Sequence, residues 1–94
     1  VEFDAVFGLN DALALGAMSA LQRRGVVVPD EVAVIGFDNV EESAFSSPSL
    51  TTIDSGLTWV AERSVDLLLS RIAGEGGEPT VEIAAHSIVA RASA

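Results

Sequence analysis

The chain has 94 residues, 49% of them hydrophobic, which is enough for one packed domain and excludes an intrinsically disordered segment. Five arginines, no lysine and fourteen carboxylates give a formal charge of -9, which would repel the phosphate backbone of a nucleic acid. The absence of cysteine excludes disulfides and thiolate sites, and a single histidine cannot form a histidine cluster. We therefore expect no metal, no cofactor and no direct contact with DNA.

The chain ends and its longest apolar runs carry no targeting signal. Val1 is not preceded by an initiator Met, and the first residues hold neither a basic region nor a cleavage site, so we expect this to be part of a longer chain. No apolar run approaches the roughly 20 residues that a membrane helix needs. We expect no membrane span.

The first recognisable unit is a strand followed by a helix. Ala5–Leu9 is a short run with β-forming residues, and Asn10 or Asp11 can cap the long Ala- and Leu-rich segment that follows. Arg23 and Arg24 suit the negative end of the helix dipole, and Gly25 is a typical residue to end the helix. The sequence predicts a helix over about 11–24.

This helix is apolar around nearly its whole circumference, so we expect a segment outside the chain to cover its second face. The run from 32 to 37 is continuously β-prone, as in strands of a parallel sheet that are buried on both faces. Strand, helix and strand then form a right-handed crossover. The fold class predicted is α/β with a parallel sheet.

The second half of the chain holds shorter elements and one long helix. Residues 39–50 read as a short acidic helix and a Ser-rich loop, and Thr51–Ile53 as a strand. Apolar residues then recur at steps of three and four from Leu57 to Ile72, which predicts an amphipathic helix. The remainder divides into a flexible Gly-rich connection over 74–79 and two candidate strands, Val81–Ile83 and Ser87–Arg91.

Two polar residues follow the strands directly. In an open α/β sheet ligands bind at the carboxyl ends of the strands, which places Asn10 and Asp38 at the informative positions. A carboxylate can accept two hydroxyl donors, and an amide both donates and accepts, so the pair suits a polyhydroxylated ligand. From spacing alone, however, structural roles are favoured: a helix cap for Asn10 and a turn for Asp38.

Other candidates for chemistry have simpler interpretations. The adjacent carboxylates Glu41 and Glu42 diverge on a helix and are read as a solvated acidic face rather than an acid/base pair. His86 has no triad partner at a suitable spacing and receives no role, and Trp59 is read as a ring lying on the helix flank. Since the phosphate-binding and nucleophile motifs are also missing, we expect that the chain is not an enzyme.

Four motifs occur in a fixed order: Asp4-Ala5-Val6-Phe7 with Asn10-Asp11, Ala14-Leu15-Gly16-Ala17, Val28-Pro29-Asp30-Glu31 running into Gly36-Phe37-Asp38, and Pro48-Ser49-Leu50-Thr51-Thr52-Ile53. Together they closely resemble the C-terminal region of the LacI/GalR repressor family. The resemblance runs from about Asp4 to Ser93 and covers nearly the whole chain.

The resemblance implies a periplasmic binding protein-like type I fold, in which two α/β lobes enclose an effector. Residues 1–94 would form the C-terminal lobe, a three-layer parallel-sheet lobe of the effector-binding and dimerisation domain, with the N-terminal lobe missing. By position, Asn10 and Asp38 match effector-contacting residues, which favours ligand binding over the purely structural roles. Ser55 stands where some members carry a Gln near the effector. Leu15 and Phe45 match positions that face the partner in a homodimer.

The function implied is that of a cytoplasmic LacI-type transcriptional repressor, whose lobe senses a small carbohydrate or related polyol and dimerises. Operator DNA would be bound only by an absent N-terminal headpiece. A periplasmic sugar-binding protein of an ABC-type transporter shares the fold and is the alternative, although the segment from Pro48 to Ile53 is more typical of regulators. A small α/β enzyme is the least favoured reading, because only Asn10 and Asp38 are visible at the strand ends.

Two departures from the family pattern lie near these sites. Asn39 stands where many members carry a second Asp after Gly-Phe-Asp. Residues 84–87 replace a stretch in which prolines and a glutamate are common, which leaves the structure before the last strand open.

Overall fold

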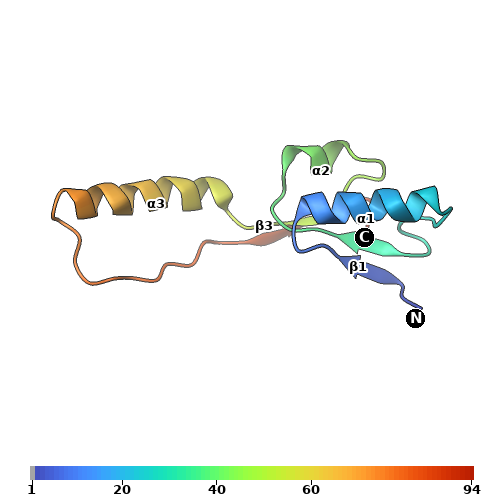
Figure 1. Ribbon diagram of the computed structural model, residues 1–94, viewed down its shortest axis with the longest axis horizontal. Helices are drawn as coiled ribbons and strands as arrows, with labels where there is room; N and C mark the ends of the chain where they lie inside the picture. The colour runs from blue at the N-terminus through green and yellow to red at the C-terminus, as the bar shows by residue number, and fades with distance from the viewer. Residues whose placement is uncertain (1) are drawn as a thin grey trace.

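The computed structural model describes residues 2–94 and shows seven secondary-structure elements (Figure 1). In chain order they are β1 (Ala5–Phe7), α1 (Asp11–Arg23), β2 (Ala33–Ile35), α2 (Glu41–Phe45), β3 (Thr52–Asp54), α3 (Leu57–Ile72) and β4 (Ser87–Val89). β1, β2 and β4 are shorter than the sequence predicts, and β3 has the predicted length but begins one residue later.

The molecule is elongated and falls into two parts. Its extents are 58 × 27 × 18 Å and its radius of gyration is 17.7 Å, whereas a compact chain of this length has a radius of about 12 Å. We call residues 2–54 and 87–94 the body, and residues 55–86, with α3 and the segment that returns from it, the arm. Figure 1 shows the arm projecting from the β3 and β4 end of the body.

The body is built on a parallel strand pair joined by α1. β1 and β2 pair in parallel, with Val6 opposite Val34. This confirms the predicted strand, helix, strand crossover. β3 continues beside β2 through a parallel bridge between Ile35 and Thr51, and β4 pairs with β3 in the antiparallel direction.

Helix α1 begins and ends as its sequence predicts. The Asn10 side chain accepts a hydrogen bond from the Leu13 N–H at 2.8 Å, Asp11 lies in the first turn, and Arg23 lies in the last. Gly25 follows with a φ of 80°, a conformation that glycine adopts without strain. The helix is one residue shorter than predicted.

One hydrophobic cluster forms the core, and it lies entirely in the body. Its buried members are Ala14, Met18, Val28, Val34 and Leu50. On α1 the apolar residues that are fully buried are Ala14 and Met18, while Leu13 on the outer side remains 57% exposed. The described residues therefore cover only part of the apolar surface of α1.

The arm has no core of its own. α3 forms over the predicted residues, but none of them is buried, and Leu68 and Ile72 on the predicted apolar stripe are 58% and 73% exposed. The predicted strand Val81–Ile83 is wrong: this segment pairs with no strand among the described residues, and its two apolar side chains are exposed. A strand needs a partner for its backbone groups, and here it has none.

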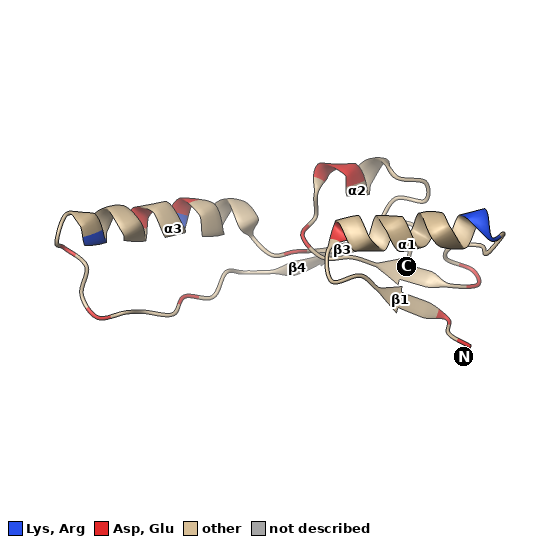
Figure 2. Ribbon diagram, viewed as in Figure 1, with Lys and Arg blue, Asp and Glu red and all other residues tan. Residues whose placement is uncertain are grey.

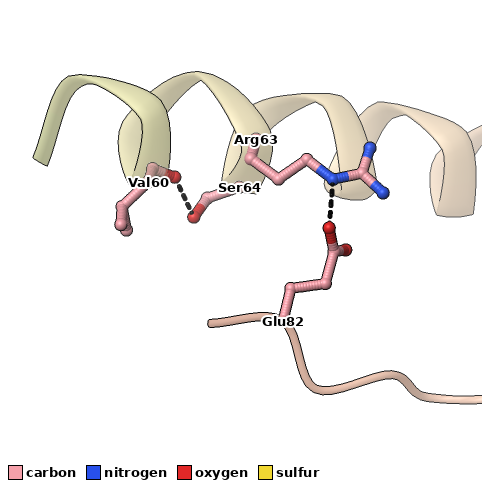
Figure 3. A network of polar contacts seen from close by, with 4 residues as sticks. All are labelled: Val60, Arg63, Ser64 and Glu82. Carbon is pink, nitrogen blue, oxygen red and sulfur yellow. Dashed lines mark hydrogen bonds and ion pairs between the residues drawn. The ribbon is translucent and has the colours of Figure 1, made fainter. Parts of the chain in front are cut away.

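An ion pair joins the two limbs of the arm. The Arg63 Nε atom donates to Glu82 Oε1 at 2.7 Å, which ties α3 to the returning segment (Figure 3). At the next residue of α3, the Ser64 hydroxyl donates to the carbonyl of Val60, one turn earlier in the helix, at 2.6 Å. Both side chains of the ion pair are partly exposed, so solvent screens the attraction.

Candidate functional site

The turns that follow β1 and β2 lie side by side at the carboxyl edge of the parallel pair. The Gly8 N–H donates to the Ile35 carbonyl at 2.8 Å, and the Asp11 N–H donates to the Phe37 carbonyl at 2.9 Å. The donors, Gly8 and Asp11, lie on either side of Asn10 in the first turn. The acceptors, Ile35 and Phe37, lie just before Asp38 in the second turn. The structure thus places the two predicted ligand residues on neighbouring turns of one edge.

Asn10 combines a structural role with a free donor. Its Oδ1 atom caps α1 by accepting from Leu13 N–H, so the cap expected from spacing is present. Among residues 2–94 its amide nitrogen has no hydrogen-bond partner. Capping therefore uses the acceptor of this side chain and leaves two N–H groups for a ligand.

Asp38 presents an unpaired carboxylate. Its backbone N–H donates to the Ile53 carbonyl at 2.9 Å, but within the described part of the chain its side chain takes part in no hydrogen bond or ion pair. It lines an open hollow of about 640 Å³, in which the other lining residues include Asn39, Asp54, Gly56 and Trp59. Such a group can accept two hydroxyl donors.

The backbone that carries Asp38 is strained. Asp38 and Asn39 have φ angles of 118° and 57°, values that residues other than glycine seldom adopt. The next amide, Val40 N–H, donates to Asp11 Oδ2 at 2.8 Å, and the Asn39 N–H donates to Thr52 Oγ1 at 3.3 Å. Backbone strain held in this way often marks a functional turn.

Asp11 is the buried centre of this arrangement. Its side chain is fully buried, and Oδ1 accepts from the Thr52 hydroxyl at 2.5 Å while Oδ2 accepts from Val40 N–H. A Cβ atom at Gly36 would overlap Asp11 Oδ1. Glycine in the Gly36-Phe37-Asp38 motif thus leaves room for the carboxylate that supports the turn.

Ser55 does not line the hollow that Asp38 lines, although its neighbours Asp54 and Gly56 do. It lines a second hollow of about 560 Å³, together with Phe37, Ile83 and His86. Its hydroxyl oxygen is buried without a hydrogen-bond partner. A buried hydroxyl in this state needs a partner from outside the described residues, such as a water molecule or a ligand.

The two predicted dimer residues differ in exposure. Phe45 at the end of α2 is 79% exposed, as a contact residue must be before it meets a partner. Leu15 is less exposed than Phe45: it is half-buried, because part of its side chain packs against the core cluster. The two residues before Ser43 on α2, Glu41 and Glu42, are exposed, in agreement with a solvated acidic face.

Sequence reasoning missed several residues at this edge. Trp59, read as lying on the helix flank, lines the same hollow as Asp38, as does Asp54. Arg91 reaches Asn39 Oδ1 with one guanidinium nitrogen at 2.8 Å. Two signals in the sequence could have found them: Trp59 is an aromatic residue off the apolar stripe of α3, and Arg91 is an arginine at the end of the apolar segment that forms β4.

Acidic residues outnumber basic ones by fourteen to five, and Figure 2 shows acidic residues at the start of α2 and in the loops. No three His, Cys, Asp or Glu side chains among residues 2–94 are grouped to hold a metal ion. None of the described helices is both long and apolar enough to cross a membrane.

The edge that carries Asn10 and Asp38 offers hydrogen-bond acceptors, amide donors and an aromatic ring, a set typical of a small-molecule site.

Comparison with known proteins places the chain in a family. The model of the periplasmic binding protein-like domain matches residues 2–94. A curated relative, the HTH-type transcriptional repressor PurR of Mannheimia succiniciproducens, is 48% identical over 80 residues, which are 84% of this chain and 24% of the relative. The chain thus spans about a quarter of the length of the curated relatives it matches.

Solved structures agree with this match. A LacI-type transcription regulator of Bifidobacterium animalis subsp. lactis has a TM-score of 0.94 at 48% identity, covering 99% of this chain and 33% of its own. The regulator CelR in complex with cellobiose has a TM-score of 0.93 at 30% identity (99% and 28% covered). A periplasmic binding protein/LacI transcriptional regulator of Alkaliphilus metalliredigens, complexed with D-xylulofuranose, has a TM-score of 0.91 at 37% identity (97% and 34% covered).

The parallel α/β body and these matches confirm the predicted fold class. The similar proteins are named as repressors and transcription regulators, which favours a regulator over a transport protein. The chain belongs to the periplasmic binding protein-like domain family, in the form that serves as the effector-binding domain of LacI/GalR-type regulators.

Proposed function

We propose that this chain is the C-terminal lobe of the effector-binding domain of a LacI-type transcriptional repressor, and that the carboxyl edge of β1 and β2 binds a small carbohydrate or polyol. The observation that carries the proposal is the Asp38 carboxylate, which is unpaired among the described residues and is held on a strained turn beside Asn10. Two similar regulators were solved with sugars bound. In this proposal the protein works in the cytoplasm and does not catalyse a reaction.

Each site residue has a defined part in this proposal. Asp38 accepts hydrogen bonds from two ligand hydroxyls, and the Asn10 amide donates one. Trp59 supplies an apolar face on the hollow that Asp38 lines. Ser55, with its unpartnered hydroxyl, contacts the ligand from the neighbouring hollow.

The test is calorimetric titration of the intact protein that carries this chain, with cellobiose and D-xylulose as probes. Asp38→Ala is expected to weaken binding at least about tenfold, because it removes a charged acceptor worth about 1.5–3 kcal/mol. Asp66→Ala, which removes the same charge from an exposed position on α3, is the matched control. Unchanged affinity in Asp38→Ala, with binding in the wild type, would disprove the site assignment.

The effect on repression follows from differential binding to two conformations. An effector that binds one arrangement of the lobes more tightly than another shifts the population toward it and changes DNA affinity by the same free energy. With its charge of -9, this lobe repels the phosphate backbone, so we assign operator contact to a headpiece elsewhere in the protein. Operator binding of the intact protein, measured with and without cellobiose or D-xylulose, tests this part.

We further propose that the lobe forms a homodimer through α1 and α2, with Leu15 and Phe45 in the interface. The exposure of Phe45 and the uncovered apolar side of α1 support this. Phe45→Glu is expected to shift the intact protein from dimer toward monomer in light scattering, since it places a charge in an apolar contact. Val81→Glu, at an even more exposed apolar residue of the arm, is the control and should leave the mass unchanged.

A further inference from the structure

We propose that Arg91 is the positioning residue that holds the Asp38–Asn39 turn in its ligand-binding conformation. This inference rests on the proposed role of Asp38 and adds a residue that lies 52 positions from Asn39 in the sequence. Arg91 follows the end of β4 by two residues. It therefore links the turn to the strand by which the chain returns from the arm.

The Arg91 guanidinium joins three segments of the body. One terminal nitrogen donates to Asn39 Oδ1 at 2.8 Å. The other donates to Ser43 Oγ at 2.6 Å and to the Leu50 carbonyl at 3.0 Å. The backbone N–H of the same residue donates to Thr51 Oγ1 at 2.9 Å, which fixes the origin of the side chain.

Arg91 makes no ion pair within residues 2–94, and its acceptors are all neutral oxygens. A planar fork with five donors can serve several acceptors at fixed angles, whereas the single ammonium nitrogen of lysine cannot. The geometry thus uses arginine for the direction of its hydrogen bonds rather than for a countercharge. This distinguishes Arg91 from the exposed Arg63 on the arm.

The turn needs such support because two consecutive non-glycine residues have left-handed φ angles. The three amides from Asp38 to Val40 are each hydrogen-bonded to α1 or β3. Two contacts of the Asn39 side chain add to these backbone bonds: its Oδ1 accepts from Arg91 at 2.8 Å, and its Nδ2 donates to Asp54 Oδ2 of β3 at 3.5 Å. Loss of the Arg91 contact removes the stronger of these two restraints.

The test uses the intact protein with Arg91→Met and Arg91→Lys, compared with Arg63→Met, which removes an arginine of the arm whose hydrogen bond goes to Glu82. Hydrogen–deuterium exchange of the amides of residues 38–40 reports the turn without any ligand. We expect exchange there to be at least about tenfold faster in both Arg91 variants, and within about twofold of wild type in Arg63→Met. Exchange of residues 14–18 in α1 should stay unchanged in all three.

A double-mutant cycle with Asn39→Ala separates positioning from a general loss of stability. If Arg91 acts through Asn39, Arg91→Met should add less than about twofold to the exchange of residues 38–40 once Asn39 is Ala, because contacting residues are not additive. Wild-type exchange at residues 38–40 in Arg91→Met, or fully additive effects in the double variant, would overturn the proposal.

Binding then connects the turn to the ligand. With whichever of cellobiose and D-xylulose binds the wild type, Arg91→Met should weaken binding about tenfold or more. Wild-type affinity despite a loosened turn would overturn the positioning role. If neither sugar binds the wild type, the proposed ligand class fails, while the exchange data still decide whether Arg91 holds the turn.

Discussion

The body and the arm contain similar apolar residues and use them differently. Leu50 in the body is fully buried, whereas Leu68 in the arm is 58% exposed. Both parts form the helices that their sequences predict, yet the core lies only in the body. The comparison teaches that periodicity determines whether a helix forms with an apolar face, and that a second segment must be present for this face to be buried.

This difference bears on the proposed domain assignment. A free apolar stripe along α3 is what we expect of a helix whose packing partner belongs to the rest of a larger protein, and the matched regulators are three to four times longer than this chain. We therefore propose that the body holds the core of the C-terminal lobe and that α3, the part of the lobe without a core, packs against other parts of the intact protein.

The largest expected contrast comes from paired truncations, Leu50→Ala in the body and Leu68→Ala in the arm. Leu50→Ala should lower the free energy of unfolding of this chain by about 2–5 kcal/mol, because it leaves a cavity in the core. Leu68→Ala should change it by less than about 0.5 kcal/mol, as is usual for a surface position. Denaturant unfolding followed by circular dichroism measures both, and equal losses would contradict the two-part description.

A second pair compares buried and exposed carboxylates. Asp11→Ala should destabilise the body by about 1–3 kcal/mol, since it leaves the Val40 N–H and the Thr52 hydroxyl without their acceptor. Asp66→Ala on the exposed surface of α3 is the matched change and should be close to neutral. Thermal unfolding of the two variants provides the measurement. A neutral Asp11→Ala would show that the buried network does not stabilise the turn.

The smallest effect is expected from the ion pair within the arm. A hydrogen bond from Arg63, opposed by partial desolvation and aided by its charge, lowers the pKa of Glu82 below the ordinary value of 4.5. A lowered pKa in the folded chain means that the pair stabilises the arm above pH 4.5, and that this contribution is lost as pH falls through the folded pKa.

Exchange of the α3 amides measures this contribution. Glu82→Gln should lower the protection of these amides slightly at pH 7 and should remove the loss of protection that the wild type shows below pH 4.5. Glu78→Gln, six residues after the end of α3 and with no ion pair among the described residues, is the control. The same pH dependence in both variants would show that the pair in Figure 3 does not hold the arm.

The sequence by itself determined the long helices of this protein and the placement of Asn10 and Asp38 at one edge of the parallel strand pair. Helix α1 follows from its Ala- and Leu-rich sequence, the Asn10 cap and the closing Gly25, and α3 follows from its apolar periodicity. These interactions span only a few residues. Asn10 and Asp38 could be placed together because a parallel crossover brings its strand ends to one edge. The family resemblance then added Ser55, Leu15 and Phe45, whose roles stay predictions.

The tertiary structure decided what depends on residues far apart in the chain. Val81–Ile83 has strand-forming residues but no partner to accept its hydrogen bonds, so its local preference is not realised. Asp11 meets Thr52 across 41 positions, and Arg91 meets Asn39 across 52. No local pattern encodes such contacts, because they exist only once β3 and β4 lie beside the turn that carries Asp38.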